Sequence, residues 1–202
     1  MSTYVLRVWL PDRPGALGAV ASRVGAVRGD VVGIEIIDRG AGRAVDELTV
    51  DLPDDALLDL LVSEVRAVEG VDVEDVRALG APNDDPAVMA LAIAAAVTTA
   101  GAGTEVAEAL ATGAQALLRA DWAAVVEVEG ERLMAAAGDD PPTGPWLCAF
   151  VRGATADGGN ADLEELAVAE APANGWSLVV GRDHLPLRGR ERAMLVGLAA
   201  LA

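Results

Sequence analysis

The sequence contains no lysine, one cysteine, one histidine and few aromatic residues. The single Cys148 excludes an intramolecular disulfide and a cysteine-based metal centre. The single His184 lies beside Arg182, Asp183 and Arg188, which favours a surface or turn contact over a general base. Because aromatic residues make up only 3% of the chain, the core must be built mainly from Ala, Val and Leu.

Basic residues are also scarce: 15 of them face 32 acidic residues, for a formal net charge of −17. Residues 1–80 carry 8 − 15 = −7 and residues 81–202 carry 7 − 17 = −10. Both halves would repel phosphate, so nucleic acid is not expected as a partner. The use of Arg alone at basic positions suggests a GC-rich bacterial coding sequence, with a salt-adapted source as the alternative.

A targeting segment is not expected, because the opening MSTYVLRVW lacks the basic stretch and apolar run of a signal peptide. We therefore expect a cytoplasmic protein. Residues 86–104 carry no charge over a length that nearly spans a bilayer. Their Ala, Gly and Thr content makes them weakly apolar, and Asp84, Asp85 and Glu105 flank them without Lys or Arg. We expect no membrane association.

The segment LGAPNDDP, residues 79–86, interrupts the patterns on both sides and predicts a domain boundary. The predicted organisation is a first domain at residues 1–80, a linker with an Ala-rich helix at 81–103, and a second domain at 104–202. With 52% apolar residues, the chain has enough material for a buried core in each domain.

Apolar spacing before the boundary predicts six elements in the order β-α-β-β-α-β. They are a strand at 4–10, a helix at 16–28, strands at 31–37 and 46–52, a helix at 54–69 and a strand at 71–79. Val32, Ile34 and Ile36 alternate as the apolar side of a half-buried strand. In the last strand the apolar phase slips between Val73 and Val76. This order predicts an α+β, ferredoxin-like unit with two helices on one face of a four-stranded antiparallel sheet.

The turn after the first strand places Asp12, Arg13, Pro14 and Gly15 directly before a helix. The first amides of a helix lack intrahelical partners and lie at the positive end of its dipole, which favours a carboxylate. Asp12 could oppose an ammonium group, and Gly15 would let a ligand approach the backbone. The turn thus offers both halves of amino-acid recognition. The alternative is that Asp12 only caps the helix and Gly15 only tightens the turn.

Residues 4–79 resemble the ACT domain, a small-molecule sensor attached to many enzymes of amino-acid metabolism. The matching stretches are LRVWLPDRPGALGAVASRV and GDVVGIEI, and the Asp-Arg-Pro-Gly turn is the most specific short motif of that family. The resemblance implies a ligand site formed by Asp12, Gly15, Ala16, Leu17, Val31 and Val32. Leu10 and about Val31 stand where serine-binding members have polar residues, which favours an apolar amino acid or no ligand. The resemblance also implies a homodimer, with either edge strands paired or helices facing, because ACT domains usually bind ligand between two units.

After the boundary, Asp85 and Pro86 predict the start of an Ala-rich helix that runs to about Thr99. Residues 104–119 predict a second helix, capped by Thr104. Its inward stripe is expected to be Val106, Leu110, Gly113 and Leu117.

The rest of the chain predicts a hairpin at 121–139, strands at 163–171 and 176–183, and a closing helix from Arg188. Residues 143–154 predict a short helix whose Trp146, Cys148 and Phe150 either line a pocket or pack as core. The closing helix is expected to turn Met194, Leu198 and Leu201 inward.

This second half resembles a GAF domain, particularly in DWAAVVEVEGERLMAAAG and WSLVVGRDHLPLRGRERAMLVGLAALA. The resemblance implies an α/β sandwich with an antiparallel sheet, from a family that senses small molecules or serves as a dimerisation scaffold. The sequence is short for the family in its middle, which favours a version without a ligand cavity.

Catalysis has no candidate residues in this sequence, since the serines lie outside a nucleophile elbow and the glycine-rich stretches lack a P-loop lysine. The acidic pairs at 54–55, 84–85 and 139–140 fit turns and helix starts, so neither a metal nor another cofactor is expected. We therefore expect a non-catalytic regulatory protein that senses an apolar amino acid and acts through its dimer or through a protein partner. The alternatives are a constitutive adaptor or structural dimer and, third, an enzyme of unrecognised mechanism.

Overall fold

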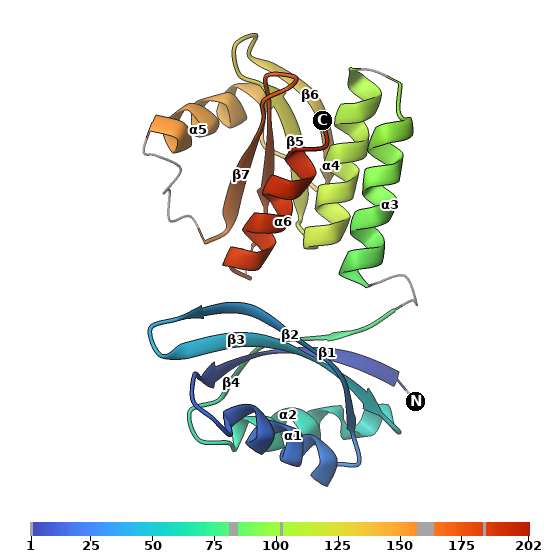
Figure 1. Cartoon of the computed structure of the whole chain (residues 1–202), viewed down its shortest axis with the longest axis vertical. Coiled ribbons are helices and arrows are strands. Elements are labelled where there is room, and N and C mark those ends of the chain that lie inside the picture. Colours follow the sequence, from blue (N-terminus) through green and yellow to red (C-terminus); the bar gives the residue numbers. More distant parts are fainter. Residues whose placement is uncertain (1, 81–84, 102, 157–163, 184) are drawn as a thin grey trace. The chain divides into compact units, whose positions relative to one another are not determined.

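A computed structural model describes residues 2–80, 85–101, 103–156, 164–183 and 185–202. The chain divides into two compact units, Met1–Pro82 and Asn83–Ala202, and each unit has its own four-stranded sheet (Figure 1). No helix of the described residues is long and apolar enough to cross a membrane.

The first unit follows the predicted order of elements. These are β1 (Ser2–Pro11), α1 (Ala16–Ala26), β2 (Asp30–Gly40), β3 (Arg43–Leu52), the 3-10 turn η1 (Asp55–Leu57), α2 (Leu58–Arg66) and β4 (Asp72–Ala78). The strands form an antiparallel sheet in the order β2-β3-β1-β4, and both helices cover one face of it (Figure 1). The prediction of an α+β, ferredoxin-like unit is therefore confirmed here.

One face of this sheet and the inner sides of both helices form the core of the first unit. The buried members include Leu6, Val8, Leu10, Val20, Val24, Leu48, Val50, Leu52, Leu61 and Val65. Cross-strand partners point to the same face of a sheet, and Val8 pairs with Asp46 while Leu6 pairs with Leu48. Alternate residues of β3 from Ala44 to Leu52 therefore lie under the helices.

The irregular phase of the last strand has a structural cause. Arg7 pairs with Asp75 but its neighbour Val8 pairs with Val73, so Glu74 is an extra residue in β4. Such a bulge shifts the side-chain alternation by one position. Val73 and Val76 consequently both pack against the core, as the slip in the sequence indicated.

The expected burial of Val32, Ile34 and Ile36 is wrong. Their side chains are 54%, 47% and 43% exposed, because β2 is an edge strand. The register between β2 and β3 also shifts twice, between Val31 and Gly33 and between Ile36 and Asp38. An edge strand with three exposed apolar side chains is a surface that a further strand could cover.

The second unit is built on a sheet that carries helices on both faces. Its elements are α3 (Pro86–Thr99), α4 (Thr104–Leu118), β5 (Trp122–Glu127), β6 (Arg132–Gly138), α5 (Gly144–Ala156), β7 (Leu166–Ala171), β8 (Trp176–Gly181) and α6 (Gly189–Ala199). The strands form an antiparallel sheet in the order β6-β5-β8-β7. Helices α4 and α6 pack on one face, α5 packs on the other, and α3 packs on α4 (Figure 1).

Several local predictions for the second unit are confirmed, and two are wrong. The carboxylate of Asp85 accepts hydrogen bonds from the amides of Ala87 and Val88, so it caps α3 as expected. Thr104 does not cap α4: the cap position is Gly103, and no side chain caps that helix. Leu201 is 37% exposed, because α6 ends at Ala199 and the chain then leaves the helical path.

Helix α5 contributes to the core rather than to a described cavity. Leu147, Cys148 and Val151 are buried against Ala124, Val126 and Val179 of the sheet. Burial raises the pKa of the Cys148 thiol, which keeps it protonated and unreactive. Trp146, which is exposed, stacks on Phe150, which packs against this core, with ring centroids 5.6 Å apart.

Candidate functional site

The predicted turn lies between the end of β1 and the start of α1. The Asp12 amide donates to the Gly42 carbonyl oxygen at 2.9 Å, which ties the turn to the hairpin between β2 and β3. The Arg13 amide donates to the Pro11 carbonyl at 2.8 Å. Asp12, Arg13, Pro14 and Gly15 are all exposed. Backbone hydrogen bonds therefore hold this motif in place, and the motif is accessible from solvent.

Gly15 is the N-cap residue of α1, with a φ of 89° in the left-handed region. A non-glycine residue would be strained there, although a Cβ would meet no atom within 4 Å. The backbone conformation, rather than lack of space, thus requires glycine. The same open space leaves the beginning of α1 uncovered at this position.

Asp12 does not cap α1, because no side chain makes a capping hydrogen bond to this helix. The alternative interpretation of Asp12 as a helix cap is therefore wrong. Ala16 and Leu17 form the first turn of α1, and Leu17 packs against the core of the first unit. The Ala16 amide donates to the Arg13 carbonyl oxygen at 3.3 Å. Four of the six predicted residues, namely Asp12, Gly15, Ala16 and Leu17, thus lie at one helix N-terminus without a side-chain cap, where the dipole favours an anion.

Val31 and Val32 lie at the other end of the sheet from Asp12. Val31 pairs with Val50, whereas Asp12 is bound to Gly42, which precedes β3. Eight residues of extended chain separate Val50 from Gly42, a distance of roughly 26 Å at about 3.3 Å per residue. Within one chain, these two valines therefore do not join the site at the turn.

Asp46 is a buried carboxylate that the sequence interpretation missed. It lies on β3 as the cross-strand partner of Val8, so its side chain points to the face covered by the helices. It is only 5% exposed, and its Oδ1 atom has no hydrogen-bond partner among the described residues. Burial of a carboxylate without a partner is costly, so this residue requires an explanation.

Two charged residues near the turn act on Asp46. Burial raises the pKa of Asp46, the charge of Arg39 lowers it, and the charge of Asp12 raises it further. Arg39 pairs with Ala44, which lies on the same face of the sheet as Asp46. Asp12 and Arg39 therefore both lie close enough to act on the charge of Asp46.

The sequence did carry a signal for Asp46. Every second residue of β3 faces the core, and Asp46 stands at one of these positions, together with Ala44, Leu48, Val50 and Leu52. A carboxylate at an inward position of an otherwise apolar strand is uncommon and often functional.

The other face of this sheet carries a second group of charged residues, which are linked by ion pairs and hydrogen bonds. Arg7 donates to Glu47 at 2.7 Å, and Arg77 donates to the other oxygen of Glu47 at 3.2 Å. Trp9 donates to Glu74 at 3.1 Å, and the Arg43 guanidinium lies 5.0 Å from the Trp9 ring centroid. These contacts link strands β1, β3 and β4 and explain the group as structural.

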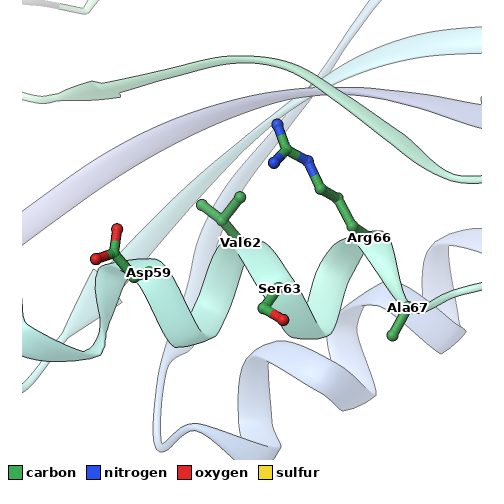
Figure 2. A pocket seen from close by; sticks show the side chains of 5 residues that line it. All are labelled: Asp59, Val62, Ser63, Arg66 and Ala67. Carbon is green, nitrogen blue, oxygen red and sulfur yellow. The ribbon is translucent and has the colours of Figure 1, made fainter.

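A surface groove of about 510 Å³ lies along α2 and contains none of the predicted site residues. Its lining residues all come from that helix: Asp59, Val62, Ser63, Arg66 and Ala67 (Figure 2). Arg66 reaches across to the carbonyl oxygen of Val73 in β4 at 3.5 Å. Because one helix supplies the whole lining, the groove is open and offers no convergent set of polar groups.

Metal-binding groups are not brought together in the described part of the chain, where no three His, Cys, Asp or Glu side chains cluster. Asp54, one of the acidic pair at 54–55, accepts a hydrogen bond from the Ala56 amide and so caps η1. Two residues discussed for the sequence, His184 and Asp84, lie outside the described residues.

Comparison with known proteins identifies the first unit. Residues 4–70 match the family model of the ACT domain, so about a third of the chain is an ACT domain. ACT domains commonly bind small-molecule effectors and form oligomers. The match does not extend to the second unit, and no curated protein matches the sequence.

Two solved structures show weak likeness to the chain. A formyltetrahydrofolate deformylase from Pseudomonas putida KT2440 is 23% identical with a TM-score of 0.30, and the match covers 40% of this chain and 29% of that one. An unknown protein from Galdieria sulphuraria is 15% identical with a TM-score of 0.35, and the match covers 89% of this chain and 78% of that one. These TM-scores are too low to support an argument about fold or function.

Proposed function

We propose that this chain is a non-catalytic regulatory protein of the cytoplasm whose ACT domain senses an amino acid with an apolar side chain. The uncapped N-terminus of α1 behind the Asp-Arg-Pro-Gly turn carries this proposal. Its amides and dipole suit a carboxylate, while nearby carboxylates suit an ammonium group. The lack of a polar side chain at Leu10, which is buried in the core, fits an apolar ligand.

The proposal includes a homodimer in which β2 pairs with β2 of a second copy. Val32, Ile34 and Ile36 supply exposed apolar side chains along this edge strand. Antiparallel pairing about a two-fold axis places the start of one strand beside the end of the other. Val31 and Val32 of a second copy would then approach the end of the sheet that holds Asp12 and Gly15. A site shared between two copies would account for the separation of these residues within one chain.

A shared site would also explain signalling. A ligand that touches both copies binds one dimer packing better than another, and it shifts the equilibrium by that difference in affinity. We further propose that the second unit is a GAF-like module that transmits this change to a protein partner. An antiparallel sheet with helices on both faces supports that assignment.

A thermal-shift screen of the purified protein against the twenty amino acids tests the sensor proposal. A ligand at a hundred times its dissociation constant should stabilise the native state by about 2.7 kcal/mol. The matched control is Asp12→Ala, which removes the exposed carboxylate of the turn. A shift for an apolar amino acid that this variant loses supports the proposal, and the absence of any shift contradicts it.

A second candidate function is a constitutive adaptor or structural dimer. The exposed apolar edge of β2 favours it, because such an edge suits a permanent interface whether or not a ligand binds. A dimer that forms without ligand and shows no shift with any amino acid would support this candidate.

A further inference from the structure

The Asp46 carboxylate lies in the interior of the first unit at the end of the sheet that carries the ACT turn. Helices α1 and α2 cover the face of the sheet to which Asp46 points (Figure 1). Helix α1 follows the end of β1, and Asp46 pairs with Val8, three residues before β1 ends at Pro11. Asp46 therefore lies on the covered face, in the half of the sheet nearer the start of α1.

Structural roles do not account for this carboxylate. It caps neither helix of this unit, and its buried Oδ1 accepts no hydrogen bond from the described residues. A purely structural position in this phase of β3 would be apolar, as Leu48, Val50 and Leu52 are. An ionised Asp46 lowers the stability of the unliganded protein unless a positive charge comes close.

The charges near Asp46 are of both signs. Asp12 and Asp46 are carboxylates, and Arg13 in the turn and Arg39 on β2 are exposed cations. No described residue donates a hydrogen bond to the buried Oδ1 atom of Asp46. The ammonium group of a ligand would supply this missing donor.

We infer that Asp46 is the partner of a ligand ammonium group at the turn between β1 and α1, so that this site requires a primary amine. The inference rests on the proposed function, since it names the group that the proposed sensor recognises. The carboxylate of an amino acid would face the first amides of α1, and its ammonium group would face Asp46 and Asp12. A carboxylic acid without an amino group would leave Asp46 unpaired and bind poorly.

The test uses the full chain and three probes that differ by one group: L-leucine, isoamylamine, which lacks the carboxylate, and isocaproate, which lacks the amine. Melting temperatures are measured for the wild type, for Asp46→Asn and Asp46→Leu, and for the control Asp59→Asn. Asp59 is an exposed carboxylate on α2, which contacts β4 at the edge of the sheet opposite to β2, so its variant makes the same charge change away from the site and from the proposed dimer contact.

The inference expects two results together. Without ligand, Asp46→Leu should melt at a higher temperature than the wild type, because it replaces a buried, unpaired carboxylate by an apolar side chain. With ligand, both Asp46 variants should bind L-leucine and isoamylamine at least tenfold more weakly than the wild type and Asp59→Asn do. Isocaproate should give no shift with any of them.

Three results would overturn the inference: a lower melting temperature in both Asp46 variants, an unchanged affinity of Asp46→Asn for the amines, or no amine-dependent shift of the wild type. The inference and the proposed function can fail separately. Binding of isoamylamine but of none of the twenty amino acids would contradict the sensor function alone. Equal binding of L-leucine by wild type and Asp46→Asn would contradict the role of Asp46 alone.

Discussion

Arg182 and Glu191 form a buried ion pair in which Arg182 Nη1 lies 2.8 Å from Glu191 Oε1. The same guanidinium donates to the carbonyl oxygens of Leu118, Leu185 and Pro186, and Glu191 accepts the amide of Arg188 at the start of α6. One arginine thereby joins the end of α4, the segment after β8 and the first turn of α6. The second unit thus contains a buried ion pair in addition to its apolar core.

Replacing Arg182 by Met should strongly destabilise the second unit. The substitution leaves the Glu191 carboxylate buried without its charge partner and removes the donors for three carbonyl oxygens. Loss of one member of a buried pair costs about 3–5 kcal/mol. Chemical denaturation followed by circular dichroism would measure the change in unfolding free energy.

The matched control for this prediction is Arg23→Met. Arg23 pairs with Glu64 at 2.8 Å on the surface of the first unit, where the two side chains are 48% and 31% exposed. Exposed pairs contribute about 0–1 kcal/mol, so this variant should change stability little. Similar losses in both variants would contradict the central structural role of Arg182.

Sequence reasoning could predict the strands of the first unit because each strand's pattern is local. The phase that buries Leu48, Val50 and Leu52 can be seen in seven residues, and a slip in β4 reveals a bulge. The exposure of Ile34 could not be predicted in this way, because it depends on β2 lying at an edge of the sheet. Strand order results from long-range pairing, which a local pattern does not encode.

Part of the candidate site can likewise be predicted from local sequence, whereas the rest depends on long-range strand pairing. The turn at Asp12 to Leu17 is one continuous segment, so its motif and its helix start can be recognised from the sequence. Val31 lies far from the turn because strand direction and register place it at the other end of the sheet. Asp46 acts near the turn only through the pairing of β3 with β1. Its inward phase could be predicted, but its neighbours could not.

The stability of the first unit should fall with rising pH because of Asp46. Its pKa in the folded state is raised above the ordinary value of 3.8, so the folded state holds the proton more strongly than the unfolded state. The unfavourable contribution is therefore absent below the unfolded pKa and increases as pH rises through the folded pKa. Unfolding free energies of the wild type and Asp46→Asn, measured from acid to neutral pH, should diverge over this window.

The sign of that divergence is specific. Relative to Asp46→Asn, the wild type should lose stability as pH rises, and the variant should show a smaller dependence. Asp59→Asn should keep the wild-type dependence, because Asp59 is exposed on α2 and does not act on Asp46. A wild type that gains stability relative to Asp46→Asn over this range would show that another group in the folded protein stabilises the ionised carboxylate.

Gly113 lets α3 approach α4 closely. A Cβ at Gly113 would lie 2.6 Å from Cγ2 of Ile93, a buried residue of α3. Gly113→Ala should therefore lower the unfolding free energy by about 1 kcal/mol, because overpacking outweighs the gain in helix propensity. The control is Gly197→Ala in α6, where a Cβ would meet no atom within 4 Å. That variant should be neutral or stabilising, and stabilisation in both would contradict tight packing of α3 on α4.

The proposed dimer predicts that Ile34→Lys gives a monomer. Ile34 is exposed near the middle of β2, and a charge on this edge would oppose pairing with a second copy. Sedimentation equilibrium of the wild type and the variant would measure the change in mass.

Leu91→Lys is the control for this prediction. Leu91 lies on the apolar helix α3 and is 72% exposed, the largest exposed fraction among the large apolar side chains of the described residues. If the dimer forms through β2, Leu91→Lys should remain dimeric while Ile34→Lys dissociates. The reverse result would place the interface on α3, and Val31 and Val32 of a second copy would then have no reason to approach the turn at Asp12. A ligand site shared across β2 thus requires that Ile34→Lys dissociates the dimer and that Leu91→Lys does not.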